Sequence, residues 1–117
     1  MEKRRNVFLG LYYKKIVGSD ERKRKGKGNM PALSMFFGII VRMQCEKGGK
    51  HNKPHIHALY GDEEIVMGFD GEILDGNFPN KQLKLLLAWV AIHEDELRAN
   101  WELLSKGEGY FKIDPLR

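Results

Sequence analysis

The chain contains one cysteine, Cys45, so no disulfide can form within it, and nothing in the sequence requires an oxidising compartment. It also lacks any run near the ~20 apolar residues that span a bilayer. The glycine-rich phosphate-binding patterns and the serine elbow of hydrolases are absent too. These absences exclude a disulfide scaffold, a membrane span and a nucleotide-dependent enzyme. With 117 residues, of which 42% are hydrophobic, the sequence predicts one small cytoplasmic domain.

Positive charge is concentrated near the N-terminus. Residues 1–29 contain ten lysines and arginines against three acidic residues, a net of +7. Residues 30–117 contain ten basic and thirteen acidic residues, a net of −3. Their charge is therefore opposite in sign to the overall charge of +4. Residues 19–29 have no apolar anchor, which predicts a flexible extension over 1–29 and a single domain over 30–117. Within this extension lies a basic cluster formed by Arg22, Lys23, Arg24 and Lys25. The cluster either contacts nucleic acid without sequence preference or is merely solvated.

The apolar pattern of the domain predicts a small antiparallel sheet. Residues 36–43 are almost continuously apolar, which favours one strand covered on both faces. Residues 55–60 alternate, and two turns containing Gly and Asp lead into short strands at 64–67 and 72–75. We therefore expect a meander of three to four strands.

Helix-forming residues follow from Asn80, which can cap a helix. A stripe at spacings of three and four predicts the face that packs on the sheet: Leu83, Leu86, Leu87 and Val90. One helix over 80–105 would be about 39 Å long, longer than a domain of about 30 Å. We therefore expect a break between His93 and Asp95, with Asp95 capping the second helix. The predicted fold class is α+β, with the meander packed against two C-terminal helices.

A second apolar set lies on the opposite side of the first helix: Leu85, Trp89 and Ile92. A domain of under ninety residues has few layers left to cover it. Either the second helix folds over these side chains, or a partner protein binds them.

Three of the four histidines fall within seven residues: His51, His55 and His57. Alternate strand residues share a face, so His55 and His57 can offer nitrogens to one metal ion while His51 folds back towards them. Zinc suits such ligands, with a further carboxylate from Asp62, Glu63 or Glu64. The cluster has no cysteine and no recognised metal-binding spacing, and a structural hydrogen bond from one imidazole is the commoner role.

The same imidazoles also predict a metal-free alternative, because histidine titrates near neutral pH. In an RNA-cleaving enzyme, His55 and His57 would act as catalytic acid and base while cations bind the phosphate. The nearby cations are Lys47, Lys50, Lys53 and Arg42. The net negative charge of residues 30–117 opposes a surface that follows a nucleic-acid backbone, and the acidic helix over 95–104 opposes DNA reading.

Several short motifs together resemble a bacterial family, the domain of unknown function numbered 4160. They are Met30-Pro31, Phe36-Phe37-Gly38-Ile39, Pro54-His55-Ile56-His57, Trp89, Asn100-Trp101-Glu102-Leu103 and Ile113-Asp114-Pro115-Leu116. The resemblance covers residues 30–117 and implies a small cytoplasmic protein without established activity. Members are often encoded beside another small protein and are sometimes labelled toxin–antitoxin related. Because they usually begin at the Met-Pro, residues 1–29 are expected to be an added segment.

These observations predict a protein that binds another small protein or itself, as one half of a toxin–antitoxin-like pair. The alternative is a histidine-based enzyme, either RNA-cleaving or metal-dependent, which uses His51, His55 and His57.

Overall fold

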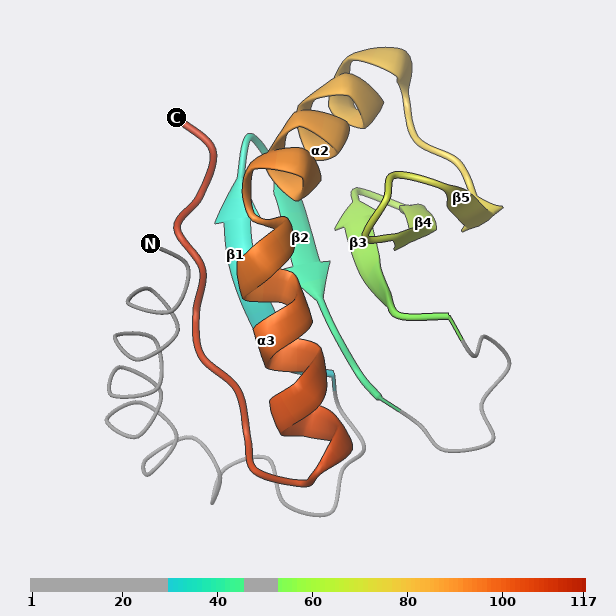
Figure 1. Cartoon of the computed structure of the whole chain (residues 1–117). Coiled ribbons are helices and arrows are strands. Elements are labelled where there is room, and N and C mark those ends of the chain that lie inside the picture. The colour runs from blue at the N-terminus through green and yellow to red at the C-terminus, as the bar shows by residue number, and fades with distance from the viewer. Residues whose placement is uncertain (1–29, 46–52) are drawn as a thin grey trace.

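The computed structural model describes residues 30–45 and 53–117. It contains a five-stranded antiparallel sheet and two helices, which confirms the predicted α+β class with one strand more than expected (Figure 1). Each strand pairs with the next along the chain. The strands are β1 (Ala32–Phe36), β2 (Ile39–Arg42), β3 (His55–Tyr60), β4 (Glu63–Gly68) and β5 (Ile73–Gly76). The helices are α2 (Asn80–Ile92) and α3 (Glu94–Ser105), and neither is long and apolar enough to cross a membrane.

The additional strand comes from a hairpin where one continuous strand was predicted. β1 ends at Phe36 and β2 begins at Ile39, so only Phe37 and Gly38 form the turn. Their φ angles are +48° and +81°, and two successive positive values are typical of the two-residue turn that joins twisted antiparallel strands. The prediction of one strand over residues 36–43 was therefore wrong.

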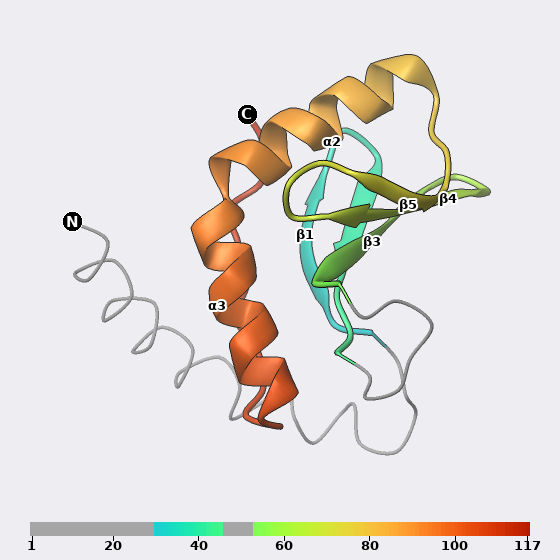
Figure 2. The same cartoon turned by 45° about the vertical axis from the view of Figure 1, so that its right-hand side comes forward.

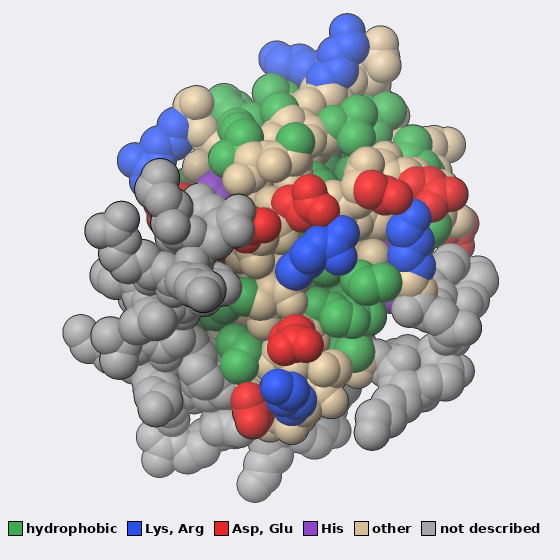
Figure 3. Space-filling view, viewed as in Figure 1, with side chains coloured by type: hydrophobic (Ala, Val, Ile, Leu, Met, Phe, Trp, Pro, Cys, Tyr) green, Lys and Arg blue, Asp and Glu red, His purple; other side chains and the backbone are tan. Residues whose placement is uncertain are grey.

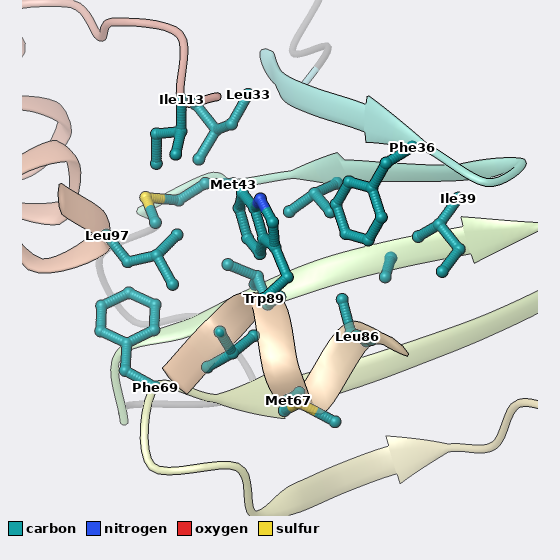
Figure 4. Close-up of a cluster of buried hydrophobic side chains, with 14 of the residues drawn as sticks. Leu33, Phe36, Ile39, Met43, Met67, Phe69, Leu86, Trp89, Leu97 and Ile113 are labelled. Atoms are coloured by element: carbon teal, nitrogen blue, oxygen red, sulfur yellow. The ribbon is translucent and has the colours of Figure 1, made fainter. Parts of the chain in front are cut away.

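The core lies between one face of the sheet and the two helices. Figure 2 shows both helices on the same side of the sheet. Phe36, Ile39 and Met67 project from the strands and meet Leu86 and Trp89 of α2 (Figure 4). Trp89 is fully buried, and its ring centroid lies 5.3 Å from that of Phe36.

The C-terminal segment, residues 108–117, completes the fold without regular secondary structure. Its Ile113 amide donates a hydrogen bond to the Leu33 carbonyl of β1 (2.9 Å). The indole Nε1 of Trp89 donates to the Asp114 carbonyl (2.9 Å). The segment therefore lies beside β1 and supplies the hydrogen-bond partner that a buried indole requires.

The helical region breaks at His93, as predicted, but the two helix starts differ from expectation. Asp95 lies inside α3, and His93 is the residue between the helices, with its Nδ1 2.5 Å from the Glu96 carboxylate. Asn80 is the first residue of α2 rather than its cap, because Pro79 takes that position with φ at −56°. Neither helix has a side-chain hydrogen bond at its N-cap.

Candidate functional site

His55 and His57 lie together at the start of β3. Their ring centroids are 5.2 Å apart, and the ring planes are inclined at 64° to each other. Strand alternation therefore brings these two histidines to the same side, as predicted. The third histidine of the predicted cluster, His51, lies outside the described residues.

A hydrogen-bond acceptor holds Nδ1 of each of these two rings. The Nδ1–H of His55 donates to the Lys53 carbonyl at 2.6 Å, and the Nδ1–H of His57 donates to Glu64 Oε2 at 3.1 Å. Carbonyl and carboxylate oxygens accept hydrogen bonds, so these two contacts place a proton on Nδ1 of each ring. An acceptor that orients the ring through Nδ1 is an arrangement found in histidines that bind metals or transfer protons.

The two histidines differ in their surroundings. His55 is buried, and its ring centroid lies 5.3 Å from that of Trp101 on α3. His57 is half-buried and pairs across the sheet with Arg42 of β2. Arg42 Nη1 contacts the Met30 carbonyl (3.4 Å), and its buried Nε has no hydrogen-bond partner among the described residues. The Arg42 guanidinium therefore borders the more accessible imidazole.

The metal prediction is only partly addressed by the described residues. Over 30–45 and 53–117, no group of three or more His, Cys, Asp or Glu side chains is placed to hold a metal ion. Glu64, one of the predicted carboxylate ligands, instead orients His57. A zinc site at His51, His55 and His57 stays a prediction.

Lys53 precedes the histidines in the chain, and its ammonium group already forms ion pairs with two carboxylates. Its Nζ lies 2.8 Å from Asp70 Oδ2 and also contacts Glu72. The hydrogen bond that Lys53 donates to Asp70, followed by the one that it donates to Glu72, raises the pKa of Lys53 above its usual value. The same Lys53 bond lowers the pKa of Asp70. Lys53 is thus committed to two carboxylates, and Lys47 and Lys50, two other cations proposed for phosphate binding, lie outside the described residues.

The predicted partner surface on α2 needs correction. Trp89 is fully buried and Leu85 is half-buried, whereas Ile92 is 58% exposed. The C-terminal segment, through Asp114, supplies the contact to Trp89 that was expected from the second helix or a partner. Leu87, predicted to face the sheet, is 37% exposed. Because α2 is apolar around most of its circumference, residue spacing alone could not determine which side meets the core.

The exposed side of α2 forms a continuous apolar stripe. Hydrophobic side chains gather along this helix in Figure 3. The exposed residues of the stripe, which we call the α2 stripe, are Leu87, Ala88, Ala91 and Ile92. These residues are three or four positions apart in the helix, so their side chains lie next to each other on successive turns.

The model of the DUF4160 family, a domain of unknown function, matches residues 38–102. The chain belongs to the DUF4160 family. The matched part of this DUF4160 protein runs from the first hairpin into α3 and includes His55, His57 and the α2 stripe. The predicted resemblance extended over 30–117, so the match confirms its central part. Comparisons with curated proteins and with solved structures give no match.

Two features of the DUF4160 domain escaped the sequence analysis. Trp101 is a ring partner of His55 although they are far apart in the chain, and the sequence analysis named it only as part of a family motif. Arg42 was named as a nearby cation without any sign that it pairs with His57. The basic cluster Arg22 to Lys25 lies outside the described residues.

Proposed function

We propose that this DUF4160 protein acts by binding another small protein, as one half of a toxin–antitoxin-like pair. The observation that carries this proposal is the α2 stripe, Leu87, Ala88, Ala91 and Ile92, whose four side chains are all exposed. Contiguous exposed apolar patches are uncommon on monomeric proteins and mark interaction surfaces. The two-protein arrangement is what the family resemblance implies.

The chemistry of the stripe favours an amphipathic helix as the docking element of the partner. Ala88 and Ala91 are small, so a second helix can approach α2 closely between the larger Leu87 and Ile92. Lys81 and Lys84 are exposed near the N-terminal end of α2. Acidic residues at the rim of the partner helix would complement these lysines and set its orientation.

The test is co-expression with the protein encoded beside this one, followed by size-exclusion chromatography with light scattering. We expect a stoichiometric complex, and Ala91→Lys should dissociate it because a charge would enter the centre of the stripe. Met35→Lys is the matched control, since Met35 is 63% exposed but lies on β1. A complex that tolerates Ala91→Lys, or the absence of any complex, would contradict the proposal.

The histidine geometry favours a second candidate function, acid–base cleavage of RNA. One imidazole would remove the proton of the ribose 2′-hydroxyl, which attacks the phosphorus, and the other would protonate the departing 5′-oxygen. Support comes from the two Nδ1 hydrogen bonds and from Arg42 beside His57, whose donors suit a phosphate oxygen.

A fluorescent RNA oligonucleotide tests this second candidate. His57→Ala should abolish cleavage, whereas His93→Ala should retain it because His93 lies at the helix junction and bonds to Glu96. Equal activity of both variants would show that the histidine pair is not responsible. Metal analysis of the untagged protein, compared with His55→Ala, tests zinc binding independently.

A further inference from the structure

One row of side chains on the sheet face away from the helices is apolar. Met35 of β1 pairs with Ile40 of β2, and Ile40 pairs with Leu59 of β3, so the three side chains lie side by side. Ile39 and Val41, the neighbours of Ile40 along β2, are fully buried in the core. Strand alternation therefore places the row on the opposite face. We call Met35, Ile40 and Leu59 the open-face row.

The open-face row lacks the cover that its composition leads one to expect. Both helices lie on the other side of the sheet (Figure 2). Met35 is 63% exposed, and Ile40 and Leu59 are half-buried. Antiparallel strands with one face in water normally alternate apolar and polar residues, whereas apolar residues on both faces indicate a strand covered on both. β2 has the second pattern over its first three residues, and the helices cover one face only.

The chain itself contains an apolar segment that can supply the cover. Residues 7–17, which lie outside the described residues, include eight hydrophobic side chains among eleven. Residues 18–29 contain none and join this segment to Met30. The Met30 carbonyl accepts a hydrogen bond from Nη1 of Arg42 (3.4 Å). Arg42 is two residues from Ile40 and therefore lies on the same face of β2. The connection to residues 7–17 thus starts beside the open-face row.

The connection is long enough for residues 7–17 to reach this row. A linker of twelve polar and glycine residues spans about 20 Å on average, whereas Ile40 is about 7 Å from Arg42 along β2. A segment tethered in this way has an effective concentration of the order of millimolar, which an untethered second copy does not reach in dilute solution.

The α2 stripe is a poorer site for the same segment. Lys81 and Lys84 are exposed on α2, and they would meet Lys14 and Lys15 of the segment. Juxtaposed like charges disfavour such a contact. The tether and the charges therefore both select the open-face row.

We propose that residues 7–17 of this chain dock on the open-face row and bury Met35, Ile40 and Leu59 beneath their own apolar side chains. Residues 18–29 would then be held at both ends on the sheet face that carries Arg42 and His57. This inference goes beyond the proposed function, because it concerns a different face of the molecule and an occupant within the same chain.

Paramagnetic NMR of the methyl-labelled full chain tests the docking. A nitroxide label is attached through Asn6→Cys, with Cys45→Ser to remove the native thiol, so that residues 7–17 stay intact. We expect the methyl signals of Ile40 and Leu59 to be lost, because the electron spin broadens nearby nuclei. The signal of Ile92, on the α2 stripe, should remain.

Two variants of the labelled chain locate the contact. Leu11→Asp in the segment should restore the signals of Ile40 and Leu59, because it would place a charge in the apolar contact. Ile92→Asp, the matched change on the α2 stripe, should leave their loss as it was. Thermal unfolding verifies that each variant is folded.

Three results would overturn the inference. The first is equal broadening of Ile40 and Ile92, and the second is signal loss that persists in Leu11→Asp. The third comes from mixing nitroxide-bearing chains without isotopes with isotope-labelled chains without nitroxide. Loss of the Ile40 signal in that mixture would mean that the segment of a second copy occupies the row. None of these results changes the test of the α2 stripe by Ala91→Lys, so the two proposals fail separately.

Discussion

At Gly76, the last residue of β5, the backbones of β4 and β5 approach too closely for any side chain. Its φ is +75°, and an added β-carbon would lie 2.2 Å from the Glu64 carbonyl oxygen. We predict that Gly76→Ala lowers the free energy of unfolding by about 3 kcal/mol, from the left-handed backbone and the backbone clash together. Gly107→Ala should cost only about 1 kcal/mol, because Gly107 has φ +71° but nothing within 4 Å of the added carbon. Denaturant unfolding measures both, and equal losses would contradict the clash.

The Lys53–Asp70 pair gives a pH dependence of known sign. The pKa of Asp70 is lowered by its hydrogen bond from Lys53. The contribution of this hydrogen bond to the free energy of unfolding is therefore present above the pKa of Asp70 in the unfolded chain, about 3.9. It is lost as the pH falls through the lower pKa of Asp70 in the folded protein. The pKa of Lys53 is raised, so its effect is lost only at alkaline pH, as the pH rises through the folded value.

We predict that Lys53→Met returns the carboxyl pKa of Asp70 upwards towards its ordinary value in an NMR titration. Lys106→Met is the control, because Lys106 lies 3.8 Å from Glu102 and does not contact Asp70. If Lys106→Met shifts Asp70 as far as Lys53→Met does, the local hydrogen bond is not the cause.

The C-terminal segment is the element that depends most on a single side chain. Asn100 of α3 is fully buried; its Nδ2 donates to the Phe111 carbonyl (3.0 Å) and its Oδ1 accepts from the Phe111 amide (2.8 Å). Asn100→Asp preserves volume but removes the donor and buries a charge, so we predict a loss of about 3 kcal/mol at neutral pH.

Tryptophan fluorescence provides a second readout of the Asn100→Asp variant, because Trp89 bonds to the same segment through the Asp114 carbonyl. The matched control is Asn80→Asp, the same chemical change at an exposed position in the first turn of α2. It should be neutral or slightly stabilising, since a negative charge is favourable at a helix N-terminus. A comparable loss in both variants would rule out the buried bidentate contact as the cause.

Elements with a regular pattern could be predicted from the sequence, and those without one could not. The alternation of residues 55–60 placed His55 and His57 on one side, and helix length required the break at His93. The β1–β2 turn was missed because Phe37-Gly38 lacks the Asn or Asp that usually marks such turns. The C-terminal segment has no periodicity, so nothing in the sequence indicated that it would contact Trp89. The ring contact between His55 and Trp101 depends on tertiary packing alone, so no local pattern in the sequence predicts it.

Across the whole molecule, charge is divided between two parts. Residues 1–29 carry a net of +7 and residues 30–117 a net of −3. Exposed acidic side chains occur on the β3–β4 turn and in the first turn of α3. Long-range electrostatics therefore disfavour a polyanion at residues 30–117, and any non-specific affinity for nucleic acid should come from the N-terminal cluster.

We predict that the full chain binds duplex DNA weakly through Arg22, Lys23, Arg24 and Lys25, with little sequence preference. Four phosphate contacts give a slope of about −3.6 for the logarithm of affinity against the logarithm of salt concentration. Replacing all four with Gln should remove most of the binding in a fluorescence-anisotropy titration. Replacing Arg98 of α3 and Lys106 at its C-cap, two exposed cations that pair with Glu94 and Glu102, should leave the slope unchanged. If the four-Gln variant retains both affinity and slope, residues outside this cluster bind the phosphates, and Arg42 beside His57 becomes the first position to test.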